Sequence, residues 1–266
     1  MKLEIISRLA GGRATPLLFV HGAWHGAWCW DVHFLEFFTR NGYDAHALSL
    51  RGHGESEGRE KLRWTRIKDY VDDVASVAQR FRTPPVVIGH SMGGFVVQKY
   101  LEDHPAPAGV LLASVPAQGV LRTALRLGAR HPLIFAKSNL TFSLYPLVAT
   151  PELAREAFFS PELDDASLRS YWSKLQDESF RGFLDMLALD LPRPARVRTP
   201  LLVLGGAKDS IFYPWQIDAT ARAYNTHAEH LPGLAHDMML EPRWRDAADR
   251  ILGWLGPTLN AGRSVK

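Results

Sequence analysis

The chain has 266 residues, of which 46% are hydrophobic and 22% are charged, and its 31 basic residues only slightly outnumber its 28 acidic ones. This composition is that of an ordinary globular protein, and it argues against both disorder and a fibrous architecture. The small positive excess is spread along the chain, which excludes the clustered basic face that nucleic-acid binding needs.

The N-terminal residues carry little functional signal. Leu3–Ser7 can form an edge strand. The first residues contain no continuous apolar region of a signal peptide, and no apolar run in the chain approaches membrane-spanning length. The single cysteine, Cys29, allows no internal disulfide, so nothing points to an oxidising compartment. We therefore expect a cytoplasmic protein with no membrane partner.

The first buried strand is predicted over Pro16–Val20, and it leads into a glycine-rich loop that reads HGAWHGAW. At the carboxyl edge of an α/β sheet, such a loop exposes backbone amides, which is the usual place for a ligand. Gly22 lets the chain turn so that the N–H of Ala23 can point inward as an oxyanion donor. The plain alternative is a turn followed by core tryptophans, and without a nucleophile nearby that alternative would be preferred.

Helices and strands then alternate. Apolar residues at helical spacing predict a helix over Trp30–Arg40. A strand is predicted over Asp44–Leu50, and helical spacing resumes in a second helix over Ile67–Phe81. Between the last two lies RGHGES, which lacks the glycine spacings of phosphate-binding loops, so we interpret it as a structural loop at a pocket rim. Within it, His53 is interpreted as a turn residue. The alternation favours a mostly parallel sheet flanked by helices.

The stretch VVIGHSMGG, residues 86–94, predicts a strand, a very tight turn and a helix, with Ser91 at the apex of the turn. Glycines two positions before and two positions after the serine leave room for this strained geometry. The turn lifts the hydroxyl above the sheet and places the N–H of Met92 at a helix start, where it can face an oxyanion. Ser91 is therefore predicted to be a nucleophile. A glycine-flanked serine can also be only a helix N-cap, so the other parts of a site must be found independently.

After the next buried strand, GVLLAS, the alternation stops. Residues 115–198 contain aromatic residues in helical settings, several prolines and no good strand. We predict that this stretch is a helical lid inserted into a core domain made of residues 1–114 and 199–266. A lid over Ser91 would create an apolar pocket, to which Trp24 and Trp28 could contribute from below. The alternative for most lid aromatics is packing against the core.

Alternation resumes with a hydrophobic strand, PLLVLGG, which ends shortly before Asp209. A carboxylate just beyond a strand end can reach across the carboxyl edge of the sheet. Pro214–Tyr224 and residues 242–255 are predicted helices, and His227–Leu231 between them is a weaker strand. His236 lies in the loop before the last helix, where its imidazole could reach over the sheet.

The order Ser91, Asp209, His236 is the nucleophile, acid, base order that accompanies a G-x-S-x-G turn. Two rivals are badly placed. His90 stands on the strand side of the turn, so its ring should point away from the hydroxyl. Asp237 is adjacent to His236 and could not easily orient the same ring. Asp209 and His236 are therefore the predicted acid and base.

These groups predict acyl transfer. His236 takes the proton from Ser91 as the hydroxyl attacks a carbonyl, and Asp209 holds the imidazole in the required tautomer. The N–H groups of Ala23 and Met92 receive the oxyanion. The reaction requires no metal and no organic cofactor, and the sequence has no Cys/His cluster or His-Glu-x-x-His motif that would hold zinc.

The chain resembles the α/β-hydrolase superfamily over essentially its whole length, through HG at 21–22, GHSMGG at 89–94, GGAKD at 205–209 and GLAH at 233–236. The resemblance implies the α/β-hydrolase fold, with a mostly parallel central sheet and a helical lid. HGAWHGAWCW is similar to the oxyanion segment of plant methyl-ester esterases and their hydroxynitrile lyase relatives, and SLRGHGES is similar to bacterial esterases and cofactor-free haloperoxidase-like members. Epoxide hydrolases and haloalkane dehalogenases resemble this fold but carry aspartate in place of Ser91, so those activities are disfavoured.

We therefore predict a serine hydrolase that cleaves a small, mostly apolar carboxylic ester, lactone or thioester. Its predicted partner is a small-molecule substrate, and the sequence does not specify an oligomeric state. A cofactor-free lyase or dioxygenase could use the same groups to deprotonate a substrate, although positions 233–241 lack the lysine expected of hydroxynitrile lyase relatives. A slow-turnover ligand receptor could also keep all three groups.

Overall fold

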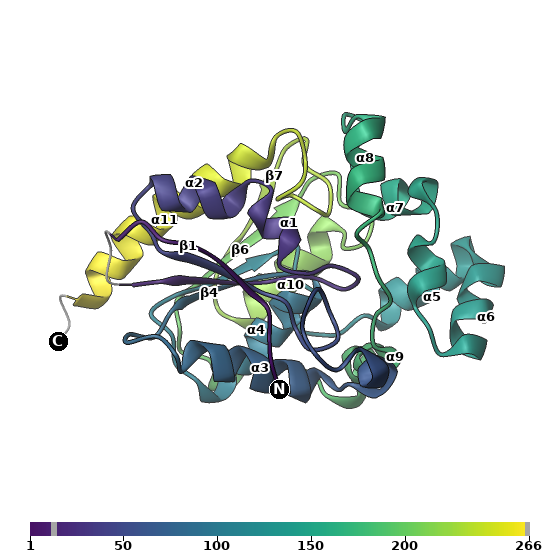
Figure 1. The fold of residues 1–266 in the computed structure, drawn as a ribbon, viewed down its shortest axis with the longest axis horizontal. Helices are drawn as coiled ribbons and strands as arrows, with labels where there is room; N and C mark the ends of the chain where they lie inside the picture. Colours follow the sequence, from purple (N-terminus) through teal and green to yellow (C-terminus); the bar gives the residue numbers. More distant parts are fainter. Residues whose placement is uncertain (12–14, 264–266) are drawn as a thin grey trace.

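A seven-stranded sheet forms the centre of the computed structural model, which describes residues 1–11 and 15–263 (Figure 1). The strands are β1 (Ile5–Arg8), β2 (Leu17–Val20), β3 (Ala45–Leu48), β4 (Val86–His90), β5 (Gly109–Leu112), β6 (Leu201–Gly206) and β7 (Ala228–Leu231). Their order in the sheet is β1-β3-β2-β4-β5-β6-β7. The edge strand β1 is antiparallel to β3, and the other described pairs are parallel. This confirms the predicted α/β class with a mostly parallel sheet.

The central strands are buried on both faces, which explains their nearly continuous apolar sequences. All five residues of β4 are buried. Side chains alternate between the two faces of β2: Leu17 and Phe19 join one hydrophobic cluster, and Leu18 and Val20 join the other. The sheet therefore separates two hydrophobic cores, each of which needs its own layer of helices.

Helices supply those two layers. The face of Leu17 and Phe19 is covered by α1 (Trp28–Asp31), α2 (Phe34–Arg40) and α11 (Trp244–Arg263). The opposite face is covered by α3 (Ile67–Ala78), α4 (Met92–Asp103) and α10 (Pro214–Ala223). Figure 1 shows α2 and α11 together on one side of the sheet, with α3 and α4 on the other.

Two predicted helices have different bounds. The single helix predicted over Trp30–Arg40 is wrong, because the backbone leaves the helical region at His33 (φ −140°) and divides the stretch into α1 and α2. The His33 ring stacks on Trp244, with ring centroids 4.7 Å apart. The last helix also runs to Arg263, beyond the predicted end at residue 255, and contains Pro257.

Residues 115–198, which we call the β5–β6 segment, contain helices but no strand in the structure. Their helical elements are α5 (Leu121–Arg130), α6 (Pro132–Thr141), η2 (Tyr145–Val148), α7 (Pro151–Phe158), α8 (Asp165–Trp172), α9 (Phe180–Leu184), η3 (Asp185–Leu189) and η4 (Pro194–Arg196). A further 3₁₀ helix, η1 (Arg59–Trp64), precedes α3. In Figure 1, α5 to α8 extend beyond one end of the sheet. The role of this segment as a lid stays a prediction.

None of the described helices is both long enough and apolar enough to cross a bilayer.

Candidate active site

Ser91 occupies the turn between β4 and α4 with a φ of +51°, a backbone region that side chains rarely adopt. Two hydrogen bonds join the turn to the end of β5 and the residues after it. Ser91 N–H donates to the carbonyl of Leu112 at 3.1 Å, and Ser91 C=O accepts from the N–H of Val115 at 3.0 Å. Two bonds to one neighbour hold the strained residue in place, and α4 begins directly after it.

The glycines around Ser91 have the steric role that the sequence predicted. A Cβ added at Gly89 would lie 2.3 Å from the carbonyl oxygen of Gly93, and one added at Gly93 would lie 2.3 Å from the carbonyl oxygen of Val20. Gly22 is similarly crowded, since a Cβ there would lie 3.0 Å from Ser91 Cβ. The absence of side chains thus lets the start of α4 pack against the loop that follows β2.

Ser91, His236 and Asp209 lie in one chain of contacts. Ser91 Oγ donates to Nε2 of His236 at 3.0 Å, and Nδ1–H of His236 donates to Oδ2 of Asp209 at 2.8 Å. Because a carboxylate only accepts, the proton of a neutral His236 lies on Nδ1 and leaves Nε2 free. The other oxygen of Asp209 accepts the N–H groups of Ile211 at 2.7 Å and Phe212 at 2.9 Å, which fixes the carboxylate.

The His236 ring is enclosed by aromatic side chains. Phe158 stacks on it with ring centroids 6.1 Å apart, and Phe212 meets it edge to face at 5.4 Å. Burial disfavours the charged imidazolium, but the Asp209 carboxylate outweighs burial and raises the pKa of His236 above its usual value. The imidazole is thus a stronger base than a free histidine and is shielded from water.

The two predicted oxyanion donors, Ala23 and Met92, line the same cavity as Ser91. Met92 is the first residue of α4, and its N–H belongs to the unsatisfied first turn of that helix. Ala23 lies in the loop after β2. No described residue accepts a hydrogen bond from either N–H.

The rivals for these roles form a separate buried cluster. His90 Nε2–H donates to the backbone carbonyl of His236 at 3.1 Å, and its ring lies 4.8 Å from the ring of His236, whereas Ser91 Oγ bonds to His236. Burial and the neighbouring His236 lower the pKa of His90 to about 3. The Asp237 carboxylate faces His25 Nε2 at 2.9 Å, an ion-pair distance without hydrogen-bond alignment, and does not orient the His236 ring.

This cluster does not fit a metal ion. His90, His236 and Asp237 bring possible ligand atoms within 4.8 Å of one another. Both ring nitrogens of His236 already contact Asp209 and Ser91. His90 Nε2 donates to a carbonyl. In this group, His90 Nδ1 and the Asp237 carboxylate remain without a hydrogen-bond partner, which is two residues against the three or four protein ligands of a zinc site.

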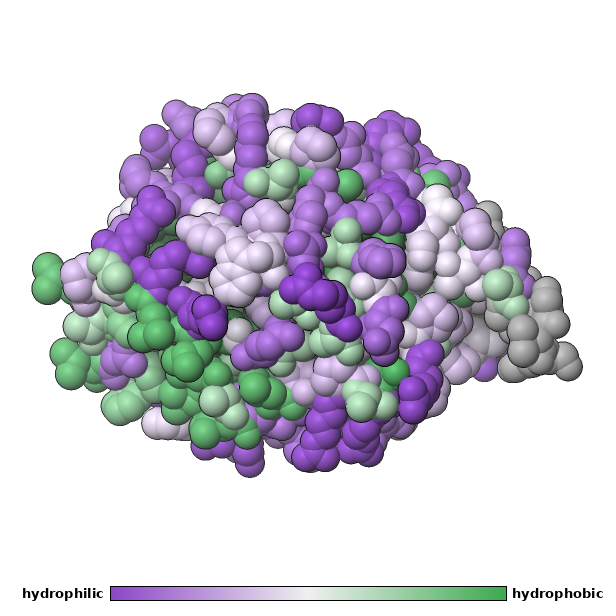
Figure 2. Space-filling view, turned by 180° about the vertical axis from the view of Figure 1, so that it is seen from behind, coloured by the Kyte–Doolittle hydropathy of each residue, from purple (hydrophilic) through white to green (hydrophobic). Residues whose placement is uncertain are grey.

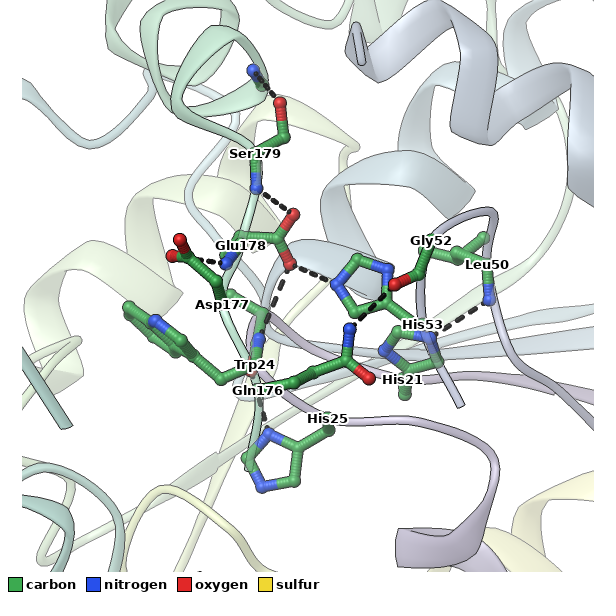
Figure 3. A network of polar contacts seen from close by, with 12 residues as sticks. His21, Trp24, His25, Leu50, Gly52, His53, Gln176, Asp177, Glu178 and Ser179 are labelled. Atoms are coloured by element: carbon green, nitrogen blue, oxygen red, sulfur yellow. Dashed lines mark hydrogen bonds and ion pairs between the residues drawn. The ribbon is translucent and has the colours of Figure 1, made fainter. Parts of the chain in front are cut away.

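A second buried network links the loop after β3 to the β5–β6 segment, and Figure 3 shows Glu178 at its centre. The Glu178 carboxylate accepts from His53 Nε2 at 3.0 Å, from the Tyr70 hydroxyl at 2.7 Å and from the N–H of Ser179 at 2.6 Å. His53 Nδ1 lies 3.1 Å from the carbonyl of Arg51. Both nitrogens of His53 thus face acceptors, and the buried imidazole and the Glu178 carboxylate lie at salt-bridge distance.

The ionised state of Glu178 follows from its partners. Burial alone would raise the pKa of Glu178, but the His53 imidazole and the surrounding hydrogen bonds lower it below its usual value. His53 is therefore more than the turn residue that the sequence predicted. No motif marked Glu178, which lies in the least patterned part of the chain.

The same network reaches the loop after β2. The N–H of Trp24 approaches Glu178 Oε2 at 3.4 Å, and its carbonyl accepts from the N–H of Gln176 at 3.0 Å. Trp24 has a φ of +65°, so this strained residue is held from both sides of its backbone. The β5–β6 segment thus contacts the backbone next to Ala23.

An apolar cavity opens beside Ser91, with about 1180 Å³ of empty space that is partly open to solvent. Its walls come from the loops after β2 and β6, from α4 and from the β5–β6 segment, and their apolar residues include Trp24, Val120, Leu127, Ile134, Met186 and Phe212. The ionisable side chains in the wall are those of Arg126, Arg130, His131, Glu156 and Glu178. Trp24 thus lies where the sequence predicted a pocket residue.

Trp28 does not line this cavity. Its ring stacks on His25 and on Tyr171, with centroids 5.4 Å and 6.3 Å away, and the Lys174 ammonium lies over it at 5.2 Å. The prediction that Trp28 contributes to the pocket is corrected: these contacts hold the ring between the loop before α1 and the C-terminal end of α8. The adjacent Cys29 is fully buried, as expected, and burial with nearby Asp237 raises the pKa of its thiol.

Comparison with known proteins gives consistent matches. The model of the alpha/beta hydrolase family matches residues 17–249 of this chain. A monoacylglycerol lipase from Mycolicibacterium smegmatis is 26% identical over 236 residues, which are 84% of this chain and 81% of that protein. The phospholipase YtpA from Bacillus subtilis is 26% identical over 250 residues, which are 86% of this chain and 90% of that protein.

Solved structures give the same fold. The structure of BpoC from Mycobacterium tuberculosis, described as a non-heme bromoperoxidase, matches with a TM-score of 0.78 and 21% identity over 97% of both chains. At this level of identity, the match supports the fold and carries no statement about the reaction.

Proposed function

Because the chain belongs to the alpha/beta hydrolase family, we propose that it is a serine hydrolase that cleaves a small, mostly apolar carboxylic ester. The observation that carries the proposal is the chain of contacts from Ser91 through His236 to Asp209, with lengths of 3.0 Å and 2.8 Å. A hydroxyl, an imidazole and a carboxylate in this sequence activate a serine for attack on a carbonyl carbon.

In the first half of the proposed reaction, a bond forms between Ser91 Oγ and the carbonyl carbon while the hydroxyl proton moves to His236 Nε2. The negative charge that develops on the carbonyl oxygen is received by the N–H groups of Ala23 and Met92. The bond to the alcohol oxygen then breaks, and the alcohol leaves with the proton from His236. Asp209 stays ionised throughout and stabilises the imidazolium.

In the second half, water attacks the acyl-enzyme and loses a proton to His236 Nε2. The bond between the acyl carbon and Ser91 Oγ breaks, the carboxylic acid leaves, and Ser91 regains its proton. Every proton is returned, so the cycle consumes only ester and water.

The proposed substrate class rests on the cavity and on the relatives. The cavity wall is mainly apolar, which favours an apolar acyl group. Two relatives are named as a monoacylglycerol lipase and a phospholipase, and both names denote lipases. Lactones and thioesters present the same type of carbonyl and belong to the proposed substrate class.

We also propose that the β5–β6 segment acts as a lid on this site. Leu127 of α5 and Ile134 of α6 contribute to the cavity wall that Ser91 shares, and Ser91 itself is only 8% exposed. A covered site excludes water from the attacking group and provides the contacts that select the acyl chain.

The experiment that tests this function is labelling with a fluorophosphonate, followed by intact-mass measurement of the wild type and Ser91→Ala. We expect one adduct on the wild type and none on Ser91→Ala. Hydrolysis of p-nitrophenyl butyrate should show multiple turnovers, and kcat should fall by at least about a thousandfold in Ser91→Ala.

Two outcomes would contradict the proposal. Labelling that persists in Ser91→Ala would assign the nucleophile to another residue. A single slow turnover with retained product would instead indicate a ligand receptor. Circular dichroism of Ser91→Ala provides the control for folding.

A further inference from the structure

Helices α5 and α6 expose an unusual number of large apolar side chains. Five lie between residues 121 and 142, with exposed fractions of 52% for Leu121, 67% for Leu125, 85% for Leu133, 81% for Leu140 and 45% for Phe142. Figure 2 shows hydrophobic residues gathered at one end of the molecule, the end to which these helices extend. Contiguous exposed apolar surface of this kind usually marks an interaction site.

Aromatic side chains from outside these helices extend the surface. The exposed ring of Trp64 lies 5.8 Å from the ring of Phe142. On the other side, Arg122 covers the ring of Trp215 at 5.6 Å. Trp215 is itself 47% exposed. We call the exposed side chains of Leu121, Leu125, Leu133, Leu140, Phe142, Trp64 and Trp215 the apolar face.

The charged residues of α5 and α6, the helices that carry most of the apolar face, have one sign. The sequence contains no aspartate or glutamate between Asp103 and Glu152, whereas the same stretch contains Arg122, Arg126, Arg130 and Lys137 at its helices. Elsewhere the chain is nearly balanced, since the other 27 of its 31 basic residues accompany 28 acidic ones. Arg130 is paired with Glu156 and Arg126 lines the cavity, so Arg122 and Lys137 are the basic groups available beside the apolar face. Their charge favours an anionic partner.

We propose that the apolar face docks on the surface of a bilayer that contains anionic lipids. Apolar side chains on paired helices can enter the boundary between headgroups and acyl chains, while arginine and lysine stay at the headgroups. Exposed tryptophans are also typical of this boundary. We expected no membrane partner because the sequence has no membrane-spanning run. Docking on the bilayer surface needs no such run, so that expectation does not argue against the proposal.

A second copy of the chain is a poorer occupant of the same face. A symmetric dimer would bring the same surface together from both copies. Arg122 and Lys137 of each copy would then approach the same basic surface of the other, without any carboxylate of α5 or α6 to offset them. Anionic headgroups supply the opposite charge that the second copy lacks.

Docking would place the cavity close to lipid. Leu127 and Ile134 line the cavity from the same helices that carry Leu125 and Leu133 of the apolar face. This part of the inference rests on the proposed function: an ester with a long acyl chain could enter from the bilayer with little exposure to water.

The test is co-sedimentation of the full chain with vesicles of phosphatidylcholine alone and with vesicles that contain phosphatidylglycerol at one part in three. We expect the wild type to pellet with the anionic vesicles and to be released as salt is raised. Leu125→Ser, Leu133→Ser and Leu140→Ser, combined in one chain, should weaken partitioning by at least about tenfold. These three residues do not line the cavity.

Charge is tested separately with Arg122→Gln combined with Lys137→Gln. Each basic residue removed should weaken binding to anionic vesicles by about fivefold and leave binding to neutral vesicles unchanged. Leu9→Ser is the matched control, because Leu9 is 69% exposed but lies next to β1. It should bind as the wild type does.

The proposal is overturned if the wild type stays in the supernatant with both vesicle types, or if the triple serine variant binds as tightly as the wild type. Sedimentation velocity provides the other contrary result: a dimer that the serine substitutions dissociate would assign the apolar face to a second copy. Ser91→Ala should dock like the wild type, so loss of the proposed hydrolysis and loss of docking are separable. Unchanged turnover of p-nitrophenyl acetate by the triple variant verifies its fold.

Discussion

The two carboxylate oxygens of Asp209 have different hydrogen-bond partners. One oxygen accepts from His236, and the other accepts backbone N–H groups of Ile211 and Phe212. The backbone bonds fix the orientation of the carboxylate, and its charge raises the pKa of His236 against the effect of burial. The basicity of His236 therefore depends on the charge of Asp209.

Asp209→Asn should change the pH profile of ester hydrolysis. The free base form of His236 is required, so kcat/KM falls as pH drops through the pKa of His236. Loss of the negative charge leaves burial, which lowers that pKa, so the acidic limb should move to lower pH. The amide also favours the wrong imidazole tautomer, and kcat should fall by about ten thousandfold. Rates measured from pH 4 to 9 on p-nitrophenyl butyrate check both effects, and an unmoved limb would contradict the role of Asp209.

Glu178→Gln should destabilise the fold. The substitution removes the carboxylate that faces the buried His53 imidazole, and removal of one partner of a buried salt bridge costs about 3–5 kcal/mol of unfolding free energy. Urea denaturation at pH 7 measures the loss. Glu55→Gln, at an exposed position of the same loop as His53, should change the free energy by less than about 0.5 kcal/mol.

A double substitution makes this prediction more specific. Glu178→Gln combined with His53→Gln removes both partners of this contact. It should therefore be less destabilised than the sum of the two single variants. Strict additivity would argue against an ion pair between these residues.

At this scale, sequence reasoning worked where chemistry requires a motif. The turn needs small neighbours, so glycines marked Ser91, and the order of acid and base along the chain identified residues that prove to be in contact. Glu178 had no comparable signal, because a buried carboxylate needs only partners in space, and His53 and Tyr70 lie more than a hundred residues away from it.

Among the elements, the β4–α4 unit is constrained most tightly by sequence. Its helix starts close to β2. A Cβ added at Gly93 would lie 2.3 Å from the carbonyl oxygen of Val20 and 2.4 Å from that of His21. Both neighbours are backbone atoms, which cannot rotate away. By contrast, an added Cβ at Gly253 in α11 meets no described atom within 4 Å.

Gly93→Ala and Gly253→Ala should therefore have opposite effects. Gly93→Ala should lower the unfolding free energy by about 3 kcal/mol or more, because the clash involves rigid backbone. Gly253→Ala should raise it by up to about 1 kcal/mol, since alanine is the better helix former. Chemical denaturation of both variants gives the comparison, and a Gly93→Ala chain as stable as the wild type would contradict the close packing of α4 on β2.

The accuracy of the predicted elements follows the strength of local signals. The buried strands β4 and β6 were predicted within one or two residues, because a continuous β-branched or leucine-rich run between turn residues has few alternatives. The break at His33 was missed, since the apolar spacing continues across it and only the packing against Trp244 shows the interruption. Individual helices of residues 115–198 were not predicted, because amphipathic helices there face both a core and a cavity.

On the scale of the whole molecule, the cavity lies between the sheet and the β5–β6 segment. Its size and apolar walls suit an acyl chain longer than acetyl. Each buried methylene group contributes about 0.8 kcal/mol, or roughly a fourfold gain in kcat/KM, until the cavity is filled. Hydrolysis of p-nitrophenyl acetate, butyrate and hexanoate should therefore become progressively more efficient.

Ile134→Trp should weaken this preference, because the larger side chain fills space in the cavity wall. We expect kcat/KM for the hexanoate ester to fall by at least about tenfold while the acetate ester is nearly unaffected. Leu133→Trp is a matched control on the same helix, since Leu133 is 85% exposed and lies outside the cavity wall. Equal effects of the two substitutions would contradict the assigned cavity.

The sheet also determines when the site can exist during refolding. Ser91 follows β4, Asp209 follows β6 and His236 follows β7, and the contact between Ser91 and His236 joins residues 145 positions apart. Parallel strands this distant in sequence pair slowly, because the entropy of closing a long loop is lost before the pairing can stabilise the chain. A chain in which β6 or β7 is not yet paired would contain a serine without its acid or its base. Recovery of hydrolysis would therefore require both pairings, whereas recovery of helical content would not.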